Sequence, residues 1–306
     1  MLFRLRRSAV LVFLASFPLS GCLFRTHKVQ RELVPVALKT ATKAELVDYI
    51  NTEAGKINTM QATVDIDTAV GGAKKGKVIE YEQIRGYVLA RKPAMLRMIG
   101  LMPFIRSRAF DMVSDGREFK LYIAPKNRFV IGQNNVATPN PQQPLENLRP
   151  KVIYDALLLR EIAADERPVL GKETETITGD KGRHYQQPNY VILVIRSQGE
   201  NNWVLSRKIY FSRIDLLPNR QEIFDETGTV VTDARYSNYK DNGGLQFPSK
   251  IEIRRPEEEY DITLTIVKLV LNDPLSDDKF VLQQPPGTQV IHLDQNQLTP
   301  NGGGSH

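Results

Sequence analysis

The side chains that could perform acid–base or metal chemistry are few and far apart. The four histidines are scattered along the chain, and no HExxH, GxSxG or glycine-rich phosphate-binding motif occurs. Asp65 and Asp67 form a candidate acid pair, but they alternate with apolar residues and are expected on the solvated face of a strand. The sequence therefore predicts no catalytic residue, no metal site and no cofactor, and favours a protein that is not an enzyme.

Cys22 is the residue with the clearest predicted chemistry, and it is the only cysteine of the chain. It follows Leu19-Ser20-Gly21, and this tetrapeptide resembles the bacterial lipobox, in which the cysteine is acylated and becomes the mature N-terminus. A basic stretch at residues 4–7 and an apolar stretch at residues 9–19, too short to span a membrane, precede it in the order of a signal peptide. We therefore expect residues 1–21 to be removed as a lipoprotein signal peptide.

An acylated Cys22 implies a lipid bilayer as a partner, because two or more acyl chains hold a protein on a membrane far more firmly than one. Residues 22–41 are polar and basic without sustained periodicity, which predicts a tether between the lipid and a folded domain. Leu23, and not aspartate, follows the cysteine. By resemblance to Gram-negative lipoproteins, this favours a lipid anchor in the outer membrane, with the protein facing the periplasm.

The charge of the chain argues against nucleic acid as a partner. The formal net charge is +6, and three of the positive charges belong to the signal peptide. The remaining charge is too small to suggest a surface for binding phosphate backbones.

The periodicity of the sequence predicts about eleven antiparallel strands and two helices. Thr42 and Glu45 form a capping box before a helix at about 43–56, and Pro150 begins a strongly apolar helix at about 150–163. There is no alternation of strands and helices, which disfavours a parallel nucleotide-binding sheet. We expect one domain over residues 42–293 and a flexible tail at 294–306.

The most apolar part of this domain runs from Gly86 to Gly132. Its strand-forming runs are separated by turn signals such as Asp115-Gly116, and it contains four of the six methionines of the chain. Methionine adapts to irregular apolar partners, so these side chains either pack a plain core or surround an apolar ligand. With two residues of an earlier strand, the candidate cavity residues are Val64, Ile66, Met95, Leu96, Met98, Phe110, Met112, Phe119, Leu121 and Tyr122.

Several motifs in this order resemble the LolA/LolB group of bacterial lipoprotein carriers and receptors. They are Val113–Gly116 followed by Phe119, Leu121-Tyr122 and Pro125, and later Asp278-Lys279-Phe280 with Pro285-Pro286-Gly287. The resemblance covers most of residues 43–293. It implies a mainly β fold, in which a strongly bent antiparallel sheet forms an incomplete barrel and helices lid its concave apolar face.

Two positions can be compared with functional residues of that group. The carrier has an arginine directly before a strand proline, whereas Lys92 stands there in this chain with Arg91 beside it, so both become candidate rim residues. The receptor has an apolar loop that helps to deliver lipoproteins to the membrane. The matching position is Leu101-Met102-Pro103-Phe104, which makes Leu101, Met102 and Phe104 candidate membrane-facing residues.

The sequence thus favours a lipid-anchored envelope protein that binds acyl chains of lipoproteins or other envelope lipids in a hydrophobic cavity. Its role would be lipoprotein localisation or lipid trafficking. The alternative is a scaffold or sensor module of an envelope assembly, built on the same fold and binding other envelope proteins. For a hydrolase, the sequence offers no candidate residues.

Overall fold

The computed structural model describes residues 32–33, 36–134, 149–178, 183–199 and 202–293. The chain divides into two compact units, residues 1–35 with 175–187 and residues 36–174 with 188–306. In its described residues, the smaller unit contains strand β1 (Glu32–Leu33), which pairs in parallel with the first residues of β10 (His184–Ser197). Cys22, the predicted signal peptide at residues 1–21 and the predicted tail at 294–306 lie outside the described residues.

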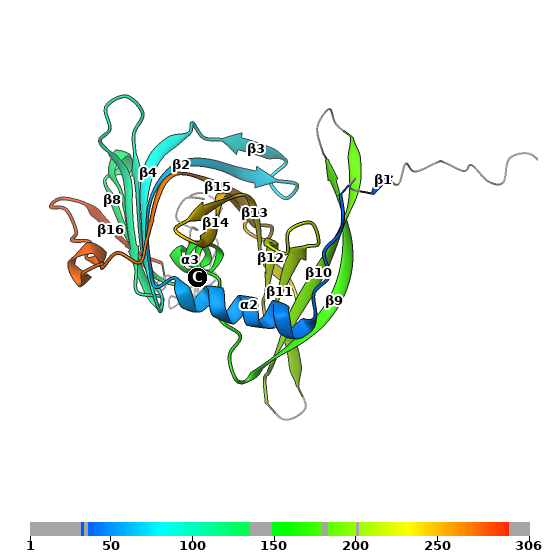
Figure 1. Cartoon of the computed structure of the whole chain (residues 1–306). Helices are drawn as coiled ribbons and strands as arrows, with labels where there is room; N and C mark the ends of the chain where they lie inside the picture. Colours follow the sequence, from blue (N-terminus) through cyan, green and yellow to red (C-terminus); the bar gives the residue numbers. More distant parts are fainter. Residues whose placement is uncertain (1–31, 34–35, 135–148, 179–182, 200–201, 294–306) are drawn as a thin grey trace, which may run out of the picture. The chain divides into compact units, whose positions relative to one another are not determined.

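The larger unit holds two helices and most of the strands (Figure 1). The helices are α2 (Lys43–Lys56) and α3 (Pro150–Leu157). The strands of the first half are β2 (Thr59–Gly72), β3 (Lys77–Glu80), β4 (Ile84–Arg91), β5 (Met95–Leu101), β6 (Arg108–Ser114), β7 (Glu118–Ile123) and β8 (Arg128–Gln133). Those of the second half are β9 (Glu166–Thr178), β10, β11 (Trp203–Ser212), β12 (Pro218–Phe224), β13 (Val230–Asn242), β14 (Leu245–Arg255), β15 (Tyr260–Leu271) and β16 (Gln289–His292).

The strand order in the larger unit is β10-β11-β12-β13-β14-β15-β2-β4-β5-β6-β7-β8-β16, with β3 beside β2 and β9 beside β10. Neighbours are antiparallel except β16, which runs parallel to β8. The prediction of a mainly β, mostly antiparallel sheet with two helices is therefore confirmed. The sheet has more strands than expected, and it is neither closed nor strongly curled, because the additional strands continue it as an open series.

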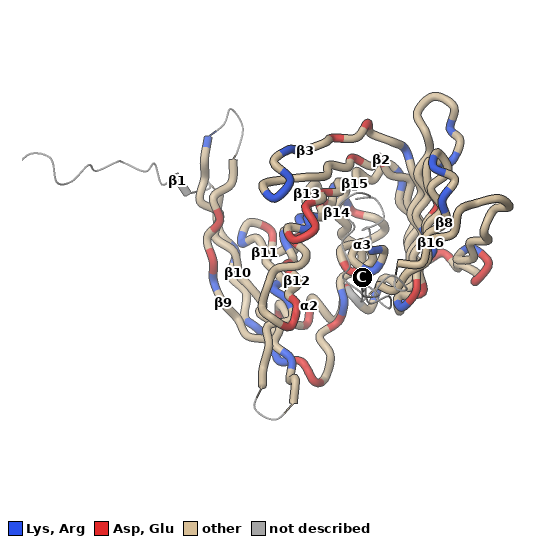
Figure 2. Tube along the Cα trace, turned by 180° about the vertical axis from the view of Figure 1, so that it is seen from behind, with Lys and Arg blue, Asp and Glu red and all other residues tan. Residues whose placement is uncertain are grey.

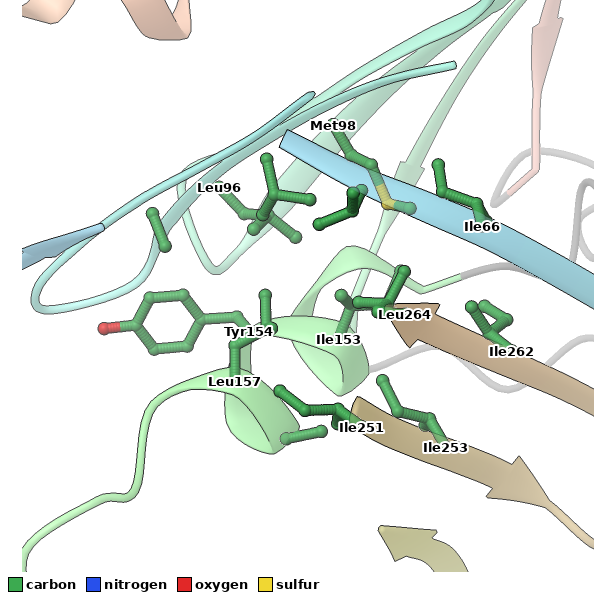
Figure 3. Close-up of a cluster of buried hydrophobic side chains, with 14 of the residues drawn as sticks. Ile66, Leu96, Met98, Ile153, Tyr154, Leu157, Ile251, Ile253, Ile262 and Leu264 are labelled. Carbon is green, nitrogen blue, oxygen red and sulfur yellow. The ribbon is translucent and has the colours of Figure 1, made fainter. Parts of the chain in front are cut away.

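One face of the sheet carries the core. Side chains of a strand point alternately to its two faces, and β2 shows this as a regular alternation of buried and partly exposed residues. Helix α3 packs on this face against β14 on one side and β5 and β6 on the other. Figure 3 shows Ile153 and Leu157 of α3 among Met98, Ile251 and Leu264.

Helix α2 covers the same face nearer to β10 and β11. Leu46 and Ile50 are buried there among Ile192, Ile209 and Phe211. The predicted capping box is present, since the Thr42 hydroxyl accepts from the Glu45 N–H and the Glu45 carboxylate accepts from the Thr42 N–H. The expected helix at 43–56 is thus confirmed at both ends.

Helix α3 ends six residues earlier than the sequence predicts. Ile162 donates its N–H to the Asn51 side chain at 3.0 Å, and Arg207 donates to the carbonyl oxygens of Arg160 and Glu161 at 2.7 and 2.9 Å. A continued helix would need the Ile162 N–H and the Asp155 carbonyl, and both are bound by side chains, since Gln221 of β12 donates to the Asp155 carbonyl at 3.0 Å. Tertiary contacts here override local helix propensity.

Candidate functional site

The inner face is apolar because the chain places apolar residues at every second position. On β2 these are Met60, Ala62, Val64 and Ile66, and all four are buried. The neighbouring strands continue the pattern with residues such as Met98 on β5. Beside α3, part of this face borders open space as well as the packed core.

A cavity of about 330 Å³ lies at this place. Strands β2, β4, β5, β6, β7 and β15 contribute to its walls, together with one residue of α3 and the segments before β4, after β5 and after β7. The lining residues are Ile66, Thr68, Tyr81, Glu82, Ile84, Met98, Pro103, Ala109, Phe110, Met112, Leu121, Ile123, Pro125, Lys126, Ile153 and Ile262. This volume is at the lower end of the range for small-molecule sites, and the predominance of apolar side chains is typical of such sites.

Two glycines form part of the floor beside this cavity. Gly86 of β4 and Gly100 of β5 are cross-strand partners on the inner face. A Cβ at Gly86 would lie 2.6 Å from the Ile66 Cδ1 atom, and a Cβ at Gly100 would overlap the ring of Phe110. The missing side chains therefore let Ile66 and Phe110 lie close to the sheet, which leaves the space above them open.

The polar residues of the lining are Thr68, Glu82 and Lys126. Glu82 and Lys126 are exposed, so their charged groups can stay hydrated while the inner walls remain apolar. A long apolar molecule with a polar end fits this distribution. Its apolar part would contact the walls, and its polar end would remain near water.

The loop between β5 and β6 lies at the same cavity through Pro103. Beyond it, Phe104 is 97% exposed and Ile105 is 71% exposed. The loop is closed by hydrogen bonds from the Met102 N–H to the Ser107 carbonyl at 2.7 Å and from the Arg106 N–H to the Met102 carbonyl at 3.1 Å. Phe104 has a φ of 63°, a backbone conformation that is unfavourable for a bulky residue, so its side chain is held outward at a cost in stability.

No family model matches the sequence, and none of the curated proteins does. Solved structures of the LolA superfamily are among those similar to this chain. One is a LolA superfamily protein from Nitrosomonas europaea, with 17% identity over 79% of this chain and 99% of that chain and a TM-score of 0.46.

Two further solved structures are similar to this chain over most of its length. A DUF1329 family protein from Desulfovibrio piger shares 13% identity over 78% of this chain and 95% of its own, with a TM-score of 0.49. A domain from Vibrio parahaemolyticus, named for outer membrane lipoprotein sorting, shares 12% identity over 78% of this chain and 97% of its own, with a TM-score of 0.46.

The structure distributes the ten expected cavity residues over three places. Five line the cavity, namely Ile66, Met98, Phe110, Met112 and Leu121. Val64, Leu96 and Phe119 are buried in the same core cluster beyond the lining. Met95 and Tyr122 occupy alternate positions of β5 and β7 that face the other side of the sheet, where Tyr122 packs against Val113, Phe129 and Leu282.

The two expected rim residues also lie away from this cavity. Arg91 donates to the Leu275 carbonyl at 2.6 Å and to Asp277 at 2.5 Å, and its guanidinium lies 5.0 Å from the centre of the Phe280 ring. Lys92 lines a separate cavity of about 60 Å³ between α2 and α3, where burial lowers the pKa of its ammonium group. In the loop, Leu101 ends β5 and is half-buried with Met102, whereas Phe104 is exposed.

Several lining residues could not be found from the sequence pattern. Ile84, Ile153 and Ile262 come from three elements that only the tertiary fold brings together. Gly86 and Gly100 shape the floor because they lack a side chain. A glycine within a strand predicts that another group approaches closely, but the sequence does not identify that group. Ile105 belongs to the exposed loop and stands directly after the predicted apolar residues.

A third cavity, of about 410 Å³, has a polar lining beyond α3. Its central group is Glu166, which lies 2.5 Å from the Arg160 guanidinium and accepts from the Ala163 N–H at 3.0 Å. Burial raises the pKa of Glu166, but these hydrogen bonds outweigh burial and leave it lowered. Burial also lowers the pKa of Arg207 to about 10. Because Arg207 binds the carbonyl groups of the 158–165 segment, this cluster stabilises the end of α3.

Among the described residues, no three His, Cys, Asp or Glu side chains are grouped so that they could bind a metal ion. No helix in the described ranges is both long and apolar enough to span a membrane.

Proposed function

We propose that this protein binds acyl chains of lipoproteins or other envelope lipids in the 330 Å³ cavity, for lipoprotein localisation or lipid trafficking. The observation that carries the proposal is an apolar cavity next to an exposed apolar loop. The polar residues among the described lining are Thr68, Glu82 and Lys126, and the binding of an apolar chain requires no catalytic group.

The energetics of such binding follow from apolar surface alone. Transfer of an acyl chain from water contributes about 0.8 kcal/mol for each buried methylene. A chain of roughly sixteen carbons therefore represents ~13 kcal/mol before the loss of chain entropy and any opening of the site are subtracted. Flexible Met98 and Met112 in the walls can adapt to chains of different shape.

The exposed loop supports a role at a membrane surface. Phe104 and Ile105 are adjacent apolar side chains that no other described residue covers, and exposed apolar groups of this kind are typical of membrane or partner contact. We infer that this loop touches the bilayer while an acyl chain passes between the membrane and the cavity. Pro103 connects the two places, because it lies in the loop and lines the cavity.

The lipid anchor is the second part of the proposal. The lipobox at Cys22 would place the acylated N-terminus in the outer membrane, with the domain in the periplasm. Mass spectrometry of the protein isolated from membranes tests this, since the N-terminal peptide should begin at Cys22 and carry acyl chains. An unmodified Cys22 would reject the anchor and leave the cavity proposal to its own test.

The cavity is tested with the full chain carrying Cys22→Ala. We expect this protein to bind an apolar fluorophore, and palmitic acid to displace the fluorophore. Ala109→Trp should weaken the binding of both ligands, because the larger side chain fills the cavity from a half-buried position. Val267→Trp is the control, because Val267 is 53% exposed on β15 and is not a lining residue. If the protein that carries only Cys22→Ala binds no apolar ligand, the proposal is refuted. A stable protein partner found by crosslinking, without lipid, would instead favour the scaffold alternative.

A further inference from the structure

The edge of strand β3 is unoccupied in the described part of the chain. β3 pairs with β2 on one side, in the register Val70–Ile79 and Gly71–Val78, and with no other strand. Such an edge is a template for another extended chain, and proteins block it by keeping the strand short or by proline, charged side chains, bulges or a covering element. β3 is four residues long, and its charged residues, Lys77 and Glu80, stand at its two ends, with Val78 and Ile79 between them. β3 has the sequence Lys-Val-Ile-Glu, all four residues are exposed, and no proline occurs among them.

The hydrogen-bonding groups on the open side can be assigned from the register. Tyr81 donates its N–H to the Thr68 carbonyl at 2.9 Å, and Gly71 donates away from β3 to the Glu259 carbonyl at 2.7 Å. In an antiparallel pair the bonded and non-bonded positions alternate. Ile79 therefore bonds to β2, whereas Val78 and Glu80 direct their N–H and C=O groups outward. These are the groups that an added strand would meet.

The inner side of this edge continues the apolar face of the cavity. Ile79 stands opposite buried Val70 and is 44% exposed, and Tyr81 is 42% exposed and lines the cavity. A strand added to β3 would place every second side chain beside Ile79 and Tyr81. Apolar residues at those positions would gain cross-strand contacts and cover exposed surface.

The position of the cavity indicates which kind of polypeptide would bind at the edge of β3. Tyr81 and Glu82 follow β3 directly and both line the cavity, so β3 runs toward its opening. A polypeptide whose N-terminus carries an acyl chain in the cavity leaves it at this end of β3. It then meets β3 as the first open backbone edge and runs antiparallel to it, toward Lys77. Figure 2 shows basic residues at the turn beyond. Lys74 of this turn is paired with Glu257, whereas exposed Lys77 suits an acidic residue at the far end of the peptide.

We propose that the edge of β3 binds, as an added antiparallel strand, the extended peptide that follows the acylated residue of a lipoprotein. The inference rests on the proposed function, because the acyl chain must occupy the cavity. It adds that the protein recognises a class of cargo, acylated polypeptides, and distinguishes it from free fatty acids and phospholipids. Main-chain bonds supply affinity in strand addition, and alternate side chains supply specificity.

The test compares palmitic acid with an N-palmitoyl hexapeptide of alternating serine and valine that ends in glutamate. Both are titrated against the full chain carrying Cys22→Ala. We expect the lipopeptide to bind at least about tenfold more tightly, because a few main-chain hydrogen bonds and side-chain contacts are added. Val78→Pro removes an outward N–H and should abolish this difference while leaving palmitic acid binding unchanged. Val78→Thr keeps the N–H and should retain the difference in affinity between the lipopeptide and palmitic acid.

A second measurement avoids any effect of proline on folding. The unsubstituted Val78 protein is titrated with the same lipopeptide N-methylated at alternate residues, and its affinity should fall to that of palmitic acid. Equal binding of the methylated and unmethylated lipopeptides would overturn the β3 inference, and so would full lipopeptide affinity in a folded Val78→Pro variant. If palmitic acid itself fails to bind, the cavity proposal is the one that is lost.

Discussion

At Gly100 a hydrogen in place of a Cβ leaves room for the ring of Phe110, and Gly86 opposite leaves room for Ile66. Both side chains line the cavity, so the size of the cavity depends on two residues that have no side chain of their own. The open space is therefore a consequence of sequence as much as of the strand arrangement.

Gly100→Ala should reduce ligand binding, because the new methyl group displaces the Phe110 ring toward the cavity. Overpacking of this kind costs about 1–3 kcal/mol of stability, and we expect palmitic acid affinity to fall with it. Urea unfolding and ligand titration measure the two effects. Gly132→Ala is the control, since its Cβ would meet the ring of Phe119 at 2.9 Å, beyond the cavity lining. Equal loss of affinity in both variants would contradict the role assigned to Gly100.

Phe104 offers a prediction in which stability and membrane contact change in opposite directions. Its φ of 63° suits glycine, and its side chain is 97% exposed, so Phe104→Gly removes strain without removing packing. We expect the free energy of unfolding to rise by about 0.5–1 kcal/mol and association with liposomes to fall. Flotation with vesicles and urea unfolding check the two parts. Unchanged flotation would remove the loop from the proposed membrane contact.

At the scale of elements, the sequence predicts each piece to the extent that local residues determine it. The capping box at Thr42 and Glu45 fixes the start of α2, and strand alternation identifies the inner residues of β2. The end of α3 could not be predicted, because Arg207 of β11 and Asn51 of α2 determine it from distant parts of the sequence. For the same reason, alternation assigned Met95 and Tyr122 to an apolar run without showing that they face the other side of the sheet.

Glu166 should make the stability of the α3–β9 connection depend on pH. Its pKa is lowered in the folded protein, so its contribution is present at neutral pH and is lost as pH falls below the ordinary glutamate value and through the lowered one. We expect Glu166→Gln to lower the free energy of unfolding by about 3 kcal/mol at pH 7, because buried Arg207 loses its anionic partner. The loss should be smaller near pH 3. Denaturant unfolding across this range measures both. Glu161→Gln, at an exposed position, should cost less than about 0.5 kcal/mol, and a pH-independent cost at Glu166 would contradict the argument.

At the scale of the whole larger unit, strand order is the property that the sequence left open. β2 pairs with β15 from Met60–Leu271 to Val70–Tyr260, which joins residues about two hundred positions apart. Alternation determines which face a side chain occupies but carries no information about the neighbouring strand. The 272–288 segment, likewise, has no periodicity that predicts its place, yet Phe280 and Leu282 are buried. The motif resemblance included Phe280 but not Leu282, and it did not indicate what Phe280 contacts.

Arg91 connects this segment to the sheet, and its contacts predict a structural role distinct from that of a ligand-releasing rim residue. Arg91→Met keeps the aliphatic part but removes the bonds to Leu275 and Asp277 and the cation–π contact with Phe280. We expect a loss of about 1–2 kcal/mol in unfolding free energy with palmitic acid affinity and release unchanged. Arg85→Met is the matched control, because the arginine of its ion pair with Asp65 is about half exposed and the pair should contribute less than about 1 kcal/mol. If Arg91→Met instead altered ligand release at unchanged stability, the arginine would act on the ligand, and the 272–288 segment would be held by its own apolar contacts alone.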